Sequence, residues 1–297
     1  MAEILSKLSD DLADIVEASG DSVVRIEARR RLPASGIVWS EDGIIVTAHH
    51  VIERDDNIRI SVGGESVQAS LVGRDPTTDV AVLKAETNGL ASTNWAAPGS
   101  ARVGHLVLAL GRPGASTAAT LGVVSALDGN WRTPAGGRLE QYLQTDLVMY
   151  PGFSGGPLVN AEGQTMGINT SALLRGVSLT VTKPSLDSIV ESLLAHGHIR
   201  RGYLGIGTQP VRIPERITET VGQETGLLIV SVESDSPAEK AGILMGDTIV
   251  GINGNPVKNV DGLLNQLNGD LIGQNVPIRI VRGEQITEFE VAIGERN

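Results

Sequence analysis

Residues 22–182 consist of short segments rich in Val and Ile, separated by Gly, Asp and Asn, with no helical pattern between them. Apolar runs of this length, bounded by turn residues, predict strands. So many strands without intervening helices favour antiparallel sheets or barrels. The predicted strands are Ser22–Ala28, Gly36–Trp39, Ile44–Val51, Asn57–Val62, Ser66–Val72, Val80–Lys84, His105–Leu110, Thr120–Leu127, Leu139–Thr145, Pro157–Asn160, Met166–Ser171 and Val177–Thr182.

The chain has 297 residues, which favours two domains. Residues 6–19 place apolar side chains at helical spacing, and Pro184–Gly197 has a proline in its first turn, so both predict helices. The segment His196–Gly202 has no periodicity and predicts a linker, dividing the chain into domains 1–200 and 201–297. The second domain is predicted to contain strands Tyr203–Gln209, Leu227–Glu233, Thr248–Ile252, Val276–Val281 and Thr287–Ile293, a helix Val260–Leu267 and a tight turn at Asn253-Gly254.

Composition excludes several classes of function. The net charge of −11 and the lack of a basic patch argue against nucleic acid as a partner. The absence of cysteine excludes disulfides, thiolate zinc sites and a cysteine nucleophile. No apolar run approaches the ~18 residues that a membrane span needs, and the N-terminus has no signal-type apolar core. We therefore expect a cytoplasmic protein if Met1 is the native start, and an extracytoplasmic one if a targeting segment has been trimmed.

The segment Gly152-Phe153-Ser154-Gly155-Gly156-Pro157-Leu158-Val159 places one hydroxyl between glycines, immediately before a predicted strand. A serine that attacks a carbonyl needs room around it and backbone N–H groups directed at the developing oxyanion. Glycine allows both, because it has no Cβ. The alternative is an ordinary Gly/Ser/Pro turn. A base and a group that orients it are needed to decide between the two.

The chain has five histidines from which a base could come. His196 and His198 lie in the predicted linker, and His105 follows a glycine at a predicted turn. His49 and His50 end a predicted strand and should project to opposite faces, so that one of them faces a cleft. The alternative for either residue is a buried histidine with a structural role.

Three segments in order resemble the motifs of the HtrA (Deg) family of serine endopeptidases, which belong to the chymotrypsin-like clan. Thr47-Ala48-His49-His50-Val51-Ile52 is similar to the histidine motif and Asp75–Lys84 to the aspartate motif. Gln144-Thr145-Asp146, followed by Gly152–Asn160, is similar to the serine motif. The order His, Asp, Ser is that of chymotrypsin. The resemblance implies a mostly β chain with a chymotrypsin-like double β-barrel protease domain, followed by a smaller α+β PDZ domain.

The resemblance assigns the base to His50, the orienting carboxylate to Asp79 and the nucleophile to Ser154. The backbone N–H groups of Gly152 and Ser154 would then form the oxyanion hole. The triad supplies acid, base and nucleophile, so the resemblance implies no metal and no organic cofactor. Two other carboxylates, Asp75 and Asp146, are rival orienters, but Asp79 alone lies in the motif and at the start of a strand.

The resemblance also implies a substrate cleft and a peptide-binding loop. The expected cleft residues are Phe153, Thr170, Ser171, Ala172, Leu179 and Val181, and the alternative is that they are ordinary barrel residues. The expected PDZ residues are the loop Tyr203, Leu204, Gly205 and Ile206 with Leu264 and Leu267, and the alternative is a structural spacer whose leucines are core. The implied partners are unfolded polypeptides and free peptide C-termini.

Three departures from the family pattern bear on these expectations. Phe153 replaces the usual asparagine, so it could hold the loop away from its active form or simply pack beneath it. The loop Arg29–Pro33 is short compared with long-looped members of the family. The resemblance implies a homotrimer, but no aromatic residue precedes Trp39, near the N-terminus where the family's trimer contacts often are. The competing hypothesis is a catalytically silent peptide-binding or chaperone-like scaffold of the same fold.

Overall fold

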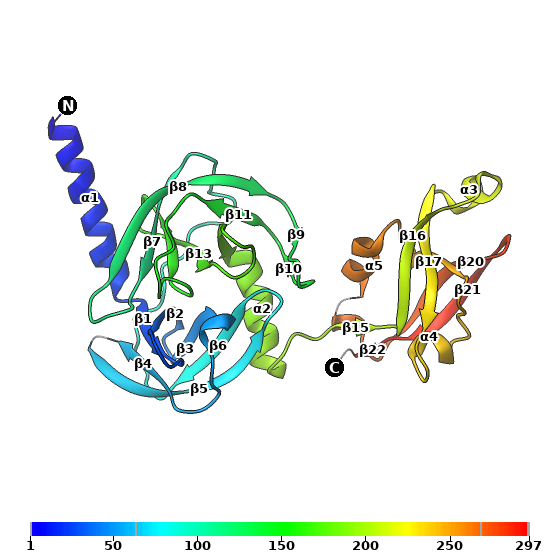
Figure 1. The fold of residues 1–297 in the computed structure, drawn as a ribbon, viewed down its shortest axis with the longest axis horizontal. Helices are drawn as coiled ribbons and strands as arrows, with labels where there is room; N and C mark the ends of the chain where they lie inside the picture. The colour runs from blue at the N-terminus through cyan, green and yellow to red at the C-terminus, as the bar shows by residue number, and fades with distance from the viewer. Residues whose placement is uncertain (1, 63, 268, 296–297) are drawn as a thin grey trace. The chain divides into compact units, whose positions relative to one another are not determined.

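The computed structural model describes residues 2–62, 64–267 and 269–295. Contacts between residues divide the chain into two compact units, Met1–Ile199 and Arg200–Asn297. Strands dominate both units (Figure 1). The fold class expected from the sequence, a double β-barrel followed by a smaller α+β domain, is confirmed.

The first unit contains two closed antiparallel barrels. The first barrel has the strand order β1-β2-β3-β6-β5-β4 and the second the order β11-β14-β13-β12-β7-β8. The strands of the first are β1 (Val23–Glu27), β2 (Ala34–Ser40), β3 (Ile44–Ala48), β4 (Ile58–Val62), β5 (Glu65–Asp75) and β6 (Val80–Ala85). Those of the second are β7 (Leu106–Gly111), β8 (Ala118–Asp128), β11 (Tyr142–Thr145), β12 (Pro157–Asn160), β13 (Thr165–Thr170) and β14 (Ser178–Thr182), with β9 (Trp131–Arg132) and β10 (Arg138–Leu139) as a hairpin outside the barrel.

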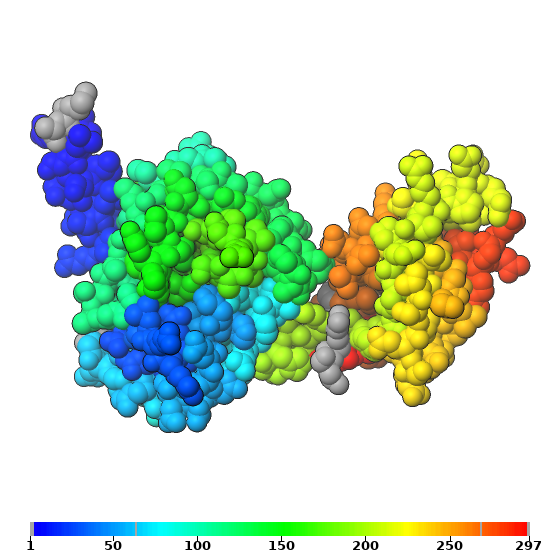
Figure 2. All heavy atoms as spheres, in the orientation of Figure 1, coloured from blue at the N-terminus to red at the C-terminus, as the bar shows by residue number. Residues whose placement is uncertain are grey.

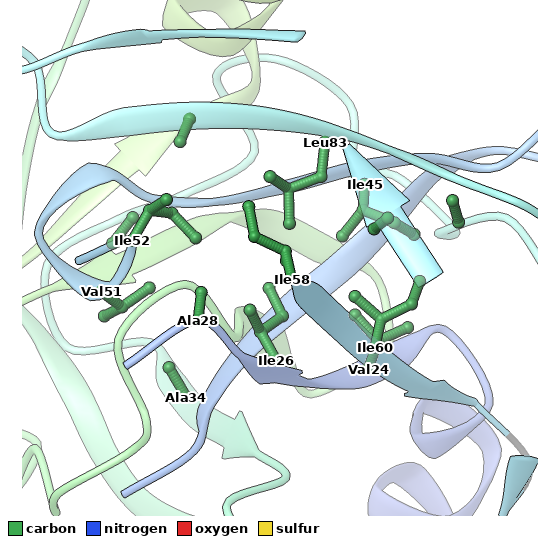
Figure 3. Packing of buried hydrophobic residues seen from close by; sticks show 14 of the residues in the cluster. Val24, Ile26, Ala28, Ala34, Ile45, Val51, Ile52, Ile58, Ile60 and Leu83 are labelled. Carbon is green, nitrogen blue, oxygen red and sulfur yellow. The ribbon is translucent and has the colours of Figure 1, made fainter. Parts of the chain in front are cut away.

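The first barrel is filled by aliphatic side chains (Figure 3). Ile26, Ile45, Ile60 and Leu83 meet in its interior and are completely buried. Burial of one such side chain stabilises the folded state by about 1.5–3 kcal/mol. The barrel is therefore a rigid support for the residues that its loops carry.

Both faces of β3 and most of β6 are buried, which explains why their sequences are mainly apolar; the exceptions are Thr47 and the partly exposed Lys84. Ile45 and Leu83 point into the first barrel, whereas Val46 and Val82 point into a second cluster shared with the other barrel. That cluster includes Ile168 of β13 and the buried face of α2 (Lys183–His196). It joins the two barrels along the side from which the site residues come.

Helix α1 (Ala2–Gly20) extends from the rest of its unit (Figure 2). Its C-terminal half packs Leu12, Ile15 and Val16 against a small cluster that includes residues of β7 and β12. The other end leaves Ile4 and Leu5 exposed. Among the described helices, none is both long enough and apolar enough to cross a membrane.

The second unit is built on a sheet with the order β16-β17-β18-β20-β21. Strand β16 is therefore an edge strand. Asn253 and Gly254 both have positive φ, as a type I′ hairpin turn requires, and the turn predicted there is present. The elements are β15 (Gly202–Tyr203), β16 (Ile206–Arg212), α3 (Glu215–Val221), β17 (Thr225–Val232), α4 (Pro237–Lys240), β18 (Thr248–Ile252), β19 (Asn255–Pro256), α5 (Val260–Gln266), η2 (Gly269–Leu271), β20 (Asn275–Arg282), β21 (Gln285–Ala292) and β22 (Gly294–Glu295).

Two predicted strands are interrupted where candidate site residues lie, and a third, Leu139–Thr145, is divided into β10 and β11 at Glu140-Gln141. The strand predicted to end at Val51 stops at Ala48, and His49–Val51 form a 3-10 turn, so the two histidines do not alternate as strand residues would. The second interruption lies at Leu204-Gly205, between β15 and β16, where Gly205 has a φ of +75°. In both places a loop with its own hydrogen bonds replaces the sheet ladder.

Candidate active site

His50 and Asp79 form a hydrogen-bonded pair at the mouth of the first barrel. The His50 backbone N–H donates to Asp79 Oδ1 at 2.8 Å, and His50 Nδ1 lies 2.8 Å from Asp79 Oδ2. The backbone N–H of His49 donates to the Asp79 carbonyl at 3.0 Å. An ionised carboxylate only accepts hydrogen bonds, so the ring proton lies on Nδ1 and Nε2 is left with its lone pair. This is the arrangement that a general base requires.

Asp79 itself is held in an unusual position. Its φ of +58° is in the left-handed region, which costs a non-glycine residue free energy unless its surroundings impose it. The side chain is 2 % exposed, and Thr170 at the end of β13 donates its hydroxyl to Asp79 Oδ2. The carboxylate thus accepts hydrogen bonds from both barrels, and these keep it oriented toward the His50 ring.

The two rival carboxylates are engaged elsewhere. Asp75 accepts from the Thr77 backbone at 3.1 Å and from the Thr78 hydroxyl at 2.7 Å, in its own turn. Asp146 accepts from the Val123 backbone at 2.7 Å, on β8. The geometry therefore places Asp79 as the partner of the His50 ring.

Ser154 follows a tight turn that only glycine can complete. Phe153 N–H donates to the Tyr150 carbonyl at 3.1 Å, and Pro151 and Gly152 occupy the two central positions. Gly152 has a φ of +94°, as the second central residue of a type II turn requires. A Cβ on Gly152 would also lie 2.7 Å from Pro113 Cβ. The turn fixes the backbone immediately before the serine.

Ser35 at the start of β2 connects this turn to the first barrel. Its hydroxyl donates to the Gly152 carbonyl at 2.6 Å and accepts from the Arg112 backbone N–H at 2.7 Å. Its backbone N–H donates to the Ser154 carbonyl at 3.3 Å. Nothing in the sequence indicates Ser35, because a single serine between small residues carries no signal for this role.

The expected oxyanion-hole donors are free in this arrangement. Within the described residues, neither the Gly152 nor the Ser154 backbone N–H donates to a protein acceptor. The peptide between Gly152 and Phe153 has both its carbonyl and its N–H engaged, so its orientation is fixed. Two unpaired N–H groups beside a serine are what stabilisation of an oxyanion requires.

His50 and Ser154 line one cleft of about 530 Å³. Ser154 Oγ is 3.3 Å from Ser171 Oγ, and across the described residues no hydrogen bond links it to His50 Nε2. Hydrogen bonds between catalytic groups are often long before substrate binds. Met149 and Tyr150 line the same cleft, together with the arginines of the loop between β1 and β2.

Only part of the expected cleft lies at the surface. Ser171 and Ala172 are exposed, and Ser171 lines the cleft. The other four expected cleft residues are buried, and their assignment to the cleft was wrong: Phe153, Thr170, Leu179 and Val181. Phe153 is 3 % exposed and packs in the core of the second barrel, where Gly111 leaves room for its ring.

The remaining three were misplaced for a common reason. Leu179 and Val181 belong to the cluster between the barrels, and Thr170 is bonded to Asp79. The resemblance placed these residues beside the nucleophile, and strand alternation in the sequence only distinguishes the two faces of a strand. It does not show which face lies between the barrels and which faces solvent.

In the second unit, the expected peptide-binding loop lies beside the edge strand β16. Gly205 has positive φ, and the Leu204 and Gly205 carbonyls accept from Ala238 at 3.0 Å and Glu233 at 2.8 Å. Of the described residues, none accepts a hydrogen bond from the Leu204 or Gly205 N–H. An unpaired edge and free N–H groups suit an extended peptide that ends in a carboxylate.

The side chains of this region divide into core and surface. Leu204 and Leu267 are buried in the core of the unit, so Leu267 does not wall a pocket as expected. Leu264 on α5 is 39 % exposed and available to a ligand. The Tyr203 hydroxyl donates to Glu233 Oε2 at 2.6 Å. Ile206 begins β16 and is partly buried.

Similarity to known families agrees with the two units. Residues 34–168 match the trypsin-like peptidase domain, and residues 202–293 match the PDZ domain. A Chlamydia muridarum protein described as a "Probable periplasmic serine endoprotease DegP-like" is 32 % identical over 276 residues, covering 91 % of this chain and 55 % of that protein. A protein of Ectopseudomonas mendocina with the same description is 34 % identical over 269 residues, covering 88 % and 56 %. The chain thus spans about half the length of the curated relatives it matches.

Two solved structures resemble the whole chain. The HtrA-type protease AlgW with a decapeptide is 26 % identical, with a TM-score of 0.80, and the match covers 96 % of this chain and 98 % of that one. The serine endoprotease from Yersinia pestis is 29 % identical, with the same TM-score and the same coverage. The order of domains, the fold and the similarity in sequence agree, and the chain belongs to the HtrA family of trypsin-like proteases that carry a PDZ domain.

Proposed function

We propose that this chain is a serine endopeptidase that cleaves unfolded or damaged polypeptides, and that its PDZ domain binds exposed C-termini. The observation that supports this most strongly is the His50–Asp79 pair, which faces the same cleft as Ser154. A silent scaffold would not need a buried carboxylate in the left-handed region directed at a histidine. Such strain persists only where the surrounding structure imposes it.

The proposed reaction uses these groups in the usual two steps of a serine protease. His50 Nε2 takes the proton of Ser154 as its oxygen attacks the carbonyl, and later gives that proton to the leaving amine. Asp79 holds the ring and stabilises the imidazolium that forms. The Gly152 and Ser154 N–H groups stabilise the oxyanion, and loss of one such donor typically raises the barrier by about 3 kcal/mol.

Covalent labelling and turnover test the nucleophile together. A fluorophosphonate should label the parent chain at Ser154, and Ser154→Ala should lose both the label and casein cleavage, by about four to six powers of ten in rate. His50→Ala should be nearly as severe, whereas the neighbouring His49→Ala serves as the matched control and should remain active. An unlabelled parent chain, or cleavage by Ser154→Ala at the parent rate, would refute the proposal.

Peptide binding tests the role of the PDZ domain. The support for this role is the edge strand β16 beside free N–H groups at Leu204-Gly205. The full-length Ser154→Ala chain, which does not consume the peptide, should bind peptides with an apolar C-terminal residue as free acids. C-terminal amidation should abolish this binding, because it removes the anion that the N–H groups receive. Equal affinity for acid and amide would exclude carboxylate capture.

We also propose that the chain forms a homotrimer. Support comes from the family resemblance and from the exposed Ile4, Leu5 and Leu8 on α1, which leave apolar surface without cover. Sedimentation analysis of the full chain and of Leu5→Glu tests this. A parent chain that sediments as a monomer at micromolar concentration would exclude it.

A further inference from the structure

The loop between β1 and β2 brings three consecutive arginines to the cleft. Arg29, Arg30 and Arg31 line the same cavity as His50 and Ser154. Arg29 is committed to the loop itself, because its guanidinium donates to the Leu32 carbonyl and to the Pro33 carbonyl, the latter at 3.3 Å. These bonds close the turn of the loop.

Arg30 and Arg31 are the chemically available members of this group. Both are exposed, and no ion pair or hydrogen bond engages either guanidinium within the described part of the chain. Most other arginines of the described chain have partners, such as Arg282 with Asp247 and Arg74 with Asp55. Two adjacent unpaired guanidinium groups repel each other, and a bound carboxylate relieves that repulsion.

The charge of the cleft is opposite to that of the chain. The whole chain carries a net charge of −11, yet the cleft lining includes three arginines against one carboxylate, Glu53. A cleft lined by one sign of charge concentrates ligands of the other sign. Guanidinium groups also bind carboxylates with two parallel hydrogen bonds, which gives specificity as well as attraction.

The position of the loop indicates which half of the substrate it meets. The loop leads directly into Ser35, whose hydroxyl holds the Gly152 carbonyl. It therefore lies on the Gly152 side of Ser154, whereas Ser171 at the end of β13 contacts the Ser154 hydroxyl. The acyl half of the substrate is expected along Ser171 and Ala172, the exposed residues that follow β13 beside Ser154. The loop between β1 and β2, which carries the arginines, is therefore expected to contact the half of the substrate that departs as the amine.

We infer that Arg30 and Arg31 recognise acidic side chains on the leaving-group side of the scissile bond, so that the enzyme prefers segments in which Asp or Glu follows that bond. This inference rests on the proposed endopeptidase function and specifies its substrate class. A single ion pair between exposed groups contributes little free energy. Here two adjacent arginines can each attract an acidic side chain of the substrate.

Quenched fluorescent peptides that differ only after the scissile bond test this. Each has Val before the bond and Ala-Ala, Glu-Glu or Lys-Lys after it, and a fourth has Glu-Glu before the Val. All are amidated to avoid capture by the PDZ domain. The Glu-Glu peptide should have kcat/KM about five- to tenfold above that of Ala-Ala, with Lys-Lys below both. The advantage should fall below about twofold at 0.5 M salt, where the Debye length is about 4 Å.

Variants distinguish the effect of Arg30 and Arg31 on the preference from a general effect of the charge of the chain. Arg30→Gln/Arg31→Gln should abolish the preference while still cleaving the Ala-Ala peptide, and Arg30→Glu/Arg31→Glu should reverse it in favour of Lys-Lys. Arg102→Gln removes the same charge from an exposed arginine outside the cleft and should keep the preference. Equal kcat/KM for all peptides, or an unchanged preference in Arg30→Gln/Arg31→Gln, would overturn the inference. A preference for acid on the acyl side would also overturn it.

A binding measurement keeps the test independent of turnover. Fluorescence anisotropy with the Ser154→Ala chain should give tighter binding of the Glu-Glu peptide than of Lys-Lys, and Arg30→Gln/Arg31→Gln in that background should remove the difference. If no peptide is cleaved but this difference is present, the proposed endopeptidase activity is wrong and the acidic-peptide site stands. If peptides are cleaved without any difference, the activity stands and the inference is wrong.

Discussion

His50 and Asp79 are joined by side-chain hydrogen bonds that are already formed, whereas Ser154 is positioned mainly by the backbone of its loop. The pair depends on a buried carboxylate that accepts hydrogen bonds from both barrels. The serine depends on a type II turn and on the hydroxyl of Ser35. Changes to the His50–Asp79 pair should therefore lower the catalytic rate with little effect on folding. Changes to the loop that holds Ser154 should affect both the catalytic rate and folding.

The largest expected effect in this comparison comes from Asp79→Asn. An amide retains the shape but presents an N–H where the carboxylate accepts the Nδ1 proton, so the imidazole adopts the wrong tautomer. We expect kcat to fall about 10⁴-fold with KM little changed, as is typical of this change in a serine protease triad. Steady-state kinetics on the Ala-Ala peptide measures it.

Asp75→Asn is the matched control for that change. Asp75 is 4 % exposed and bonds to Thr77 and Thr78, so this variant should lose stability and keep kcat. If the two variants had equal kcat, the distinction between orienting and structural carboxylates in this site would be wrong.

Phe153→Asn tests whether Phe153 supports the active loop or restrains it. The ring is buried against the second-barrel core, and its removal should cost about 3 kcal/mol of unfolding free energy. Urea or thermal unfolding of the full chain measures this cost. We expect basal activity to fall as well, because the turn before Ser154 loses its anchor. Higher basal activity with unchanged stability would mean that Phe153 restrains the loop from its active form.

Ser35→Ala should have a smaller effect, on both stability and kcat. The change removes the donor to the Gly152 carbonyl and the acceptor for Arg112 N–H, which costs about 1–3 kcal/mol where buried groups are left unpaired. The oxyanion donors would then be less well ordered, and we expect kcat to fall by about 10–100-fold.

Thr93→Val provides the comparison for Ser35→Ala. The Thr93 hydroxyl also makes a buried bond to a backbone carbonyl, that of Val38 at 2.7 Å, but it does not line the cleft. The two variants should lose similar stability, while only Ser35→Ala loses kcat. A parallel loss of kcat in both would show that Ser35 acts through general stability alone.

The sequence predicted the strands, the helices α1, α2 and α5 and the family, because apolar alternation, turn residues and motif order are local signals. It indicated His50, Asp79 and Ser154 through the motifs, and the geometry brings their segments to one cleft. It did not indicate Ser35 or the role of Thr170, because their partners lie 117 and 91 residues away in the chain.

The misplaced cleft residues reflect a different limit. Leu179 and Val181 alternate correctly along β14, but only the packing of one barrel against the other decides that this face is covered. Phe153 was expected in the cleft from the resemblance, and the turn at Gly152 directs it into the core instead. The short helices α3 and α4 were not predicted, and α4, with four residues, is too short to show a period.

The smallest expected effect concerns His49, the neighbour of the base. Burial lowers the pKa of His49 below its ordinary value of 6.5, and Asp79 opposes this shift while Arg74 supports it. Its Nδ1 is buried without a hydrogen-bond partner among the described residues. The folded state therefore binds the His49 proton less readily than the unfolded chain does. This contribution to stability is complete above about pH 6.5 and is lost as the pH falls below that value.

His49→Gln should accordingly make the thermal midpoint less sensitive to acid. Between pH 7 and pH 5 we expect the parent midpoint to fall by about 1–2 °C more than that of His49→Gln, a small difference because the ring is only partly buried and solvent screens it. His196→Gln, the same substitution at an exposed histidine of α2, should follow the parent. If His49→Gln and the parent lost stability equally over this range, the acid sensitivity would have to come from groups other than His49.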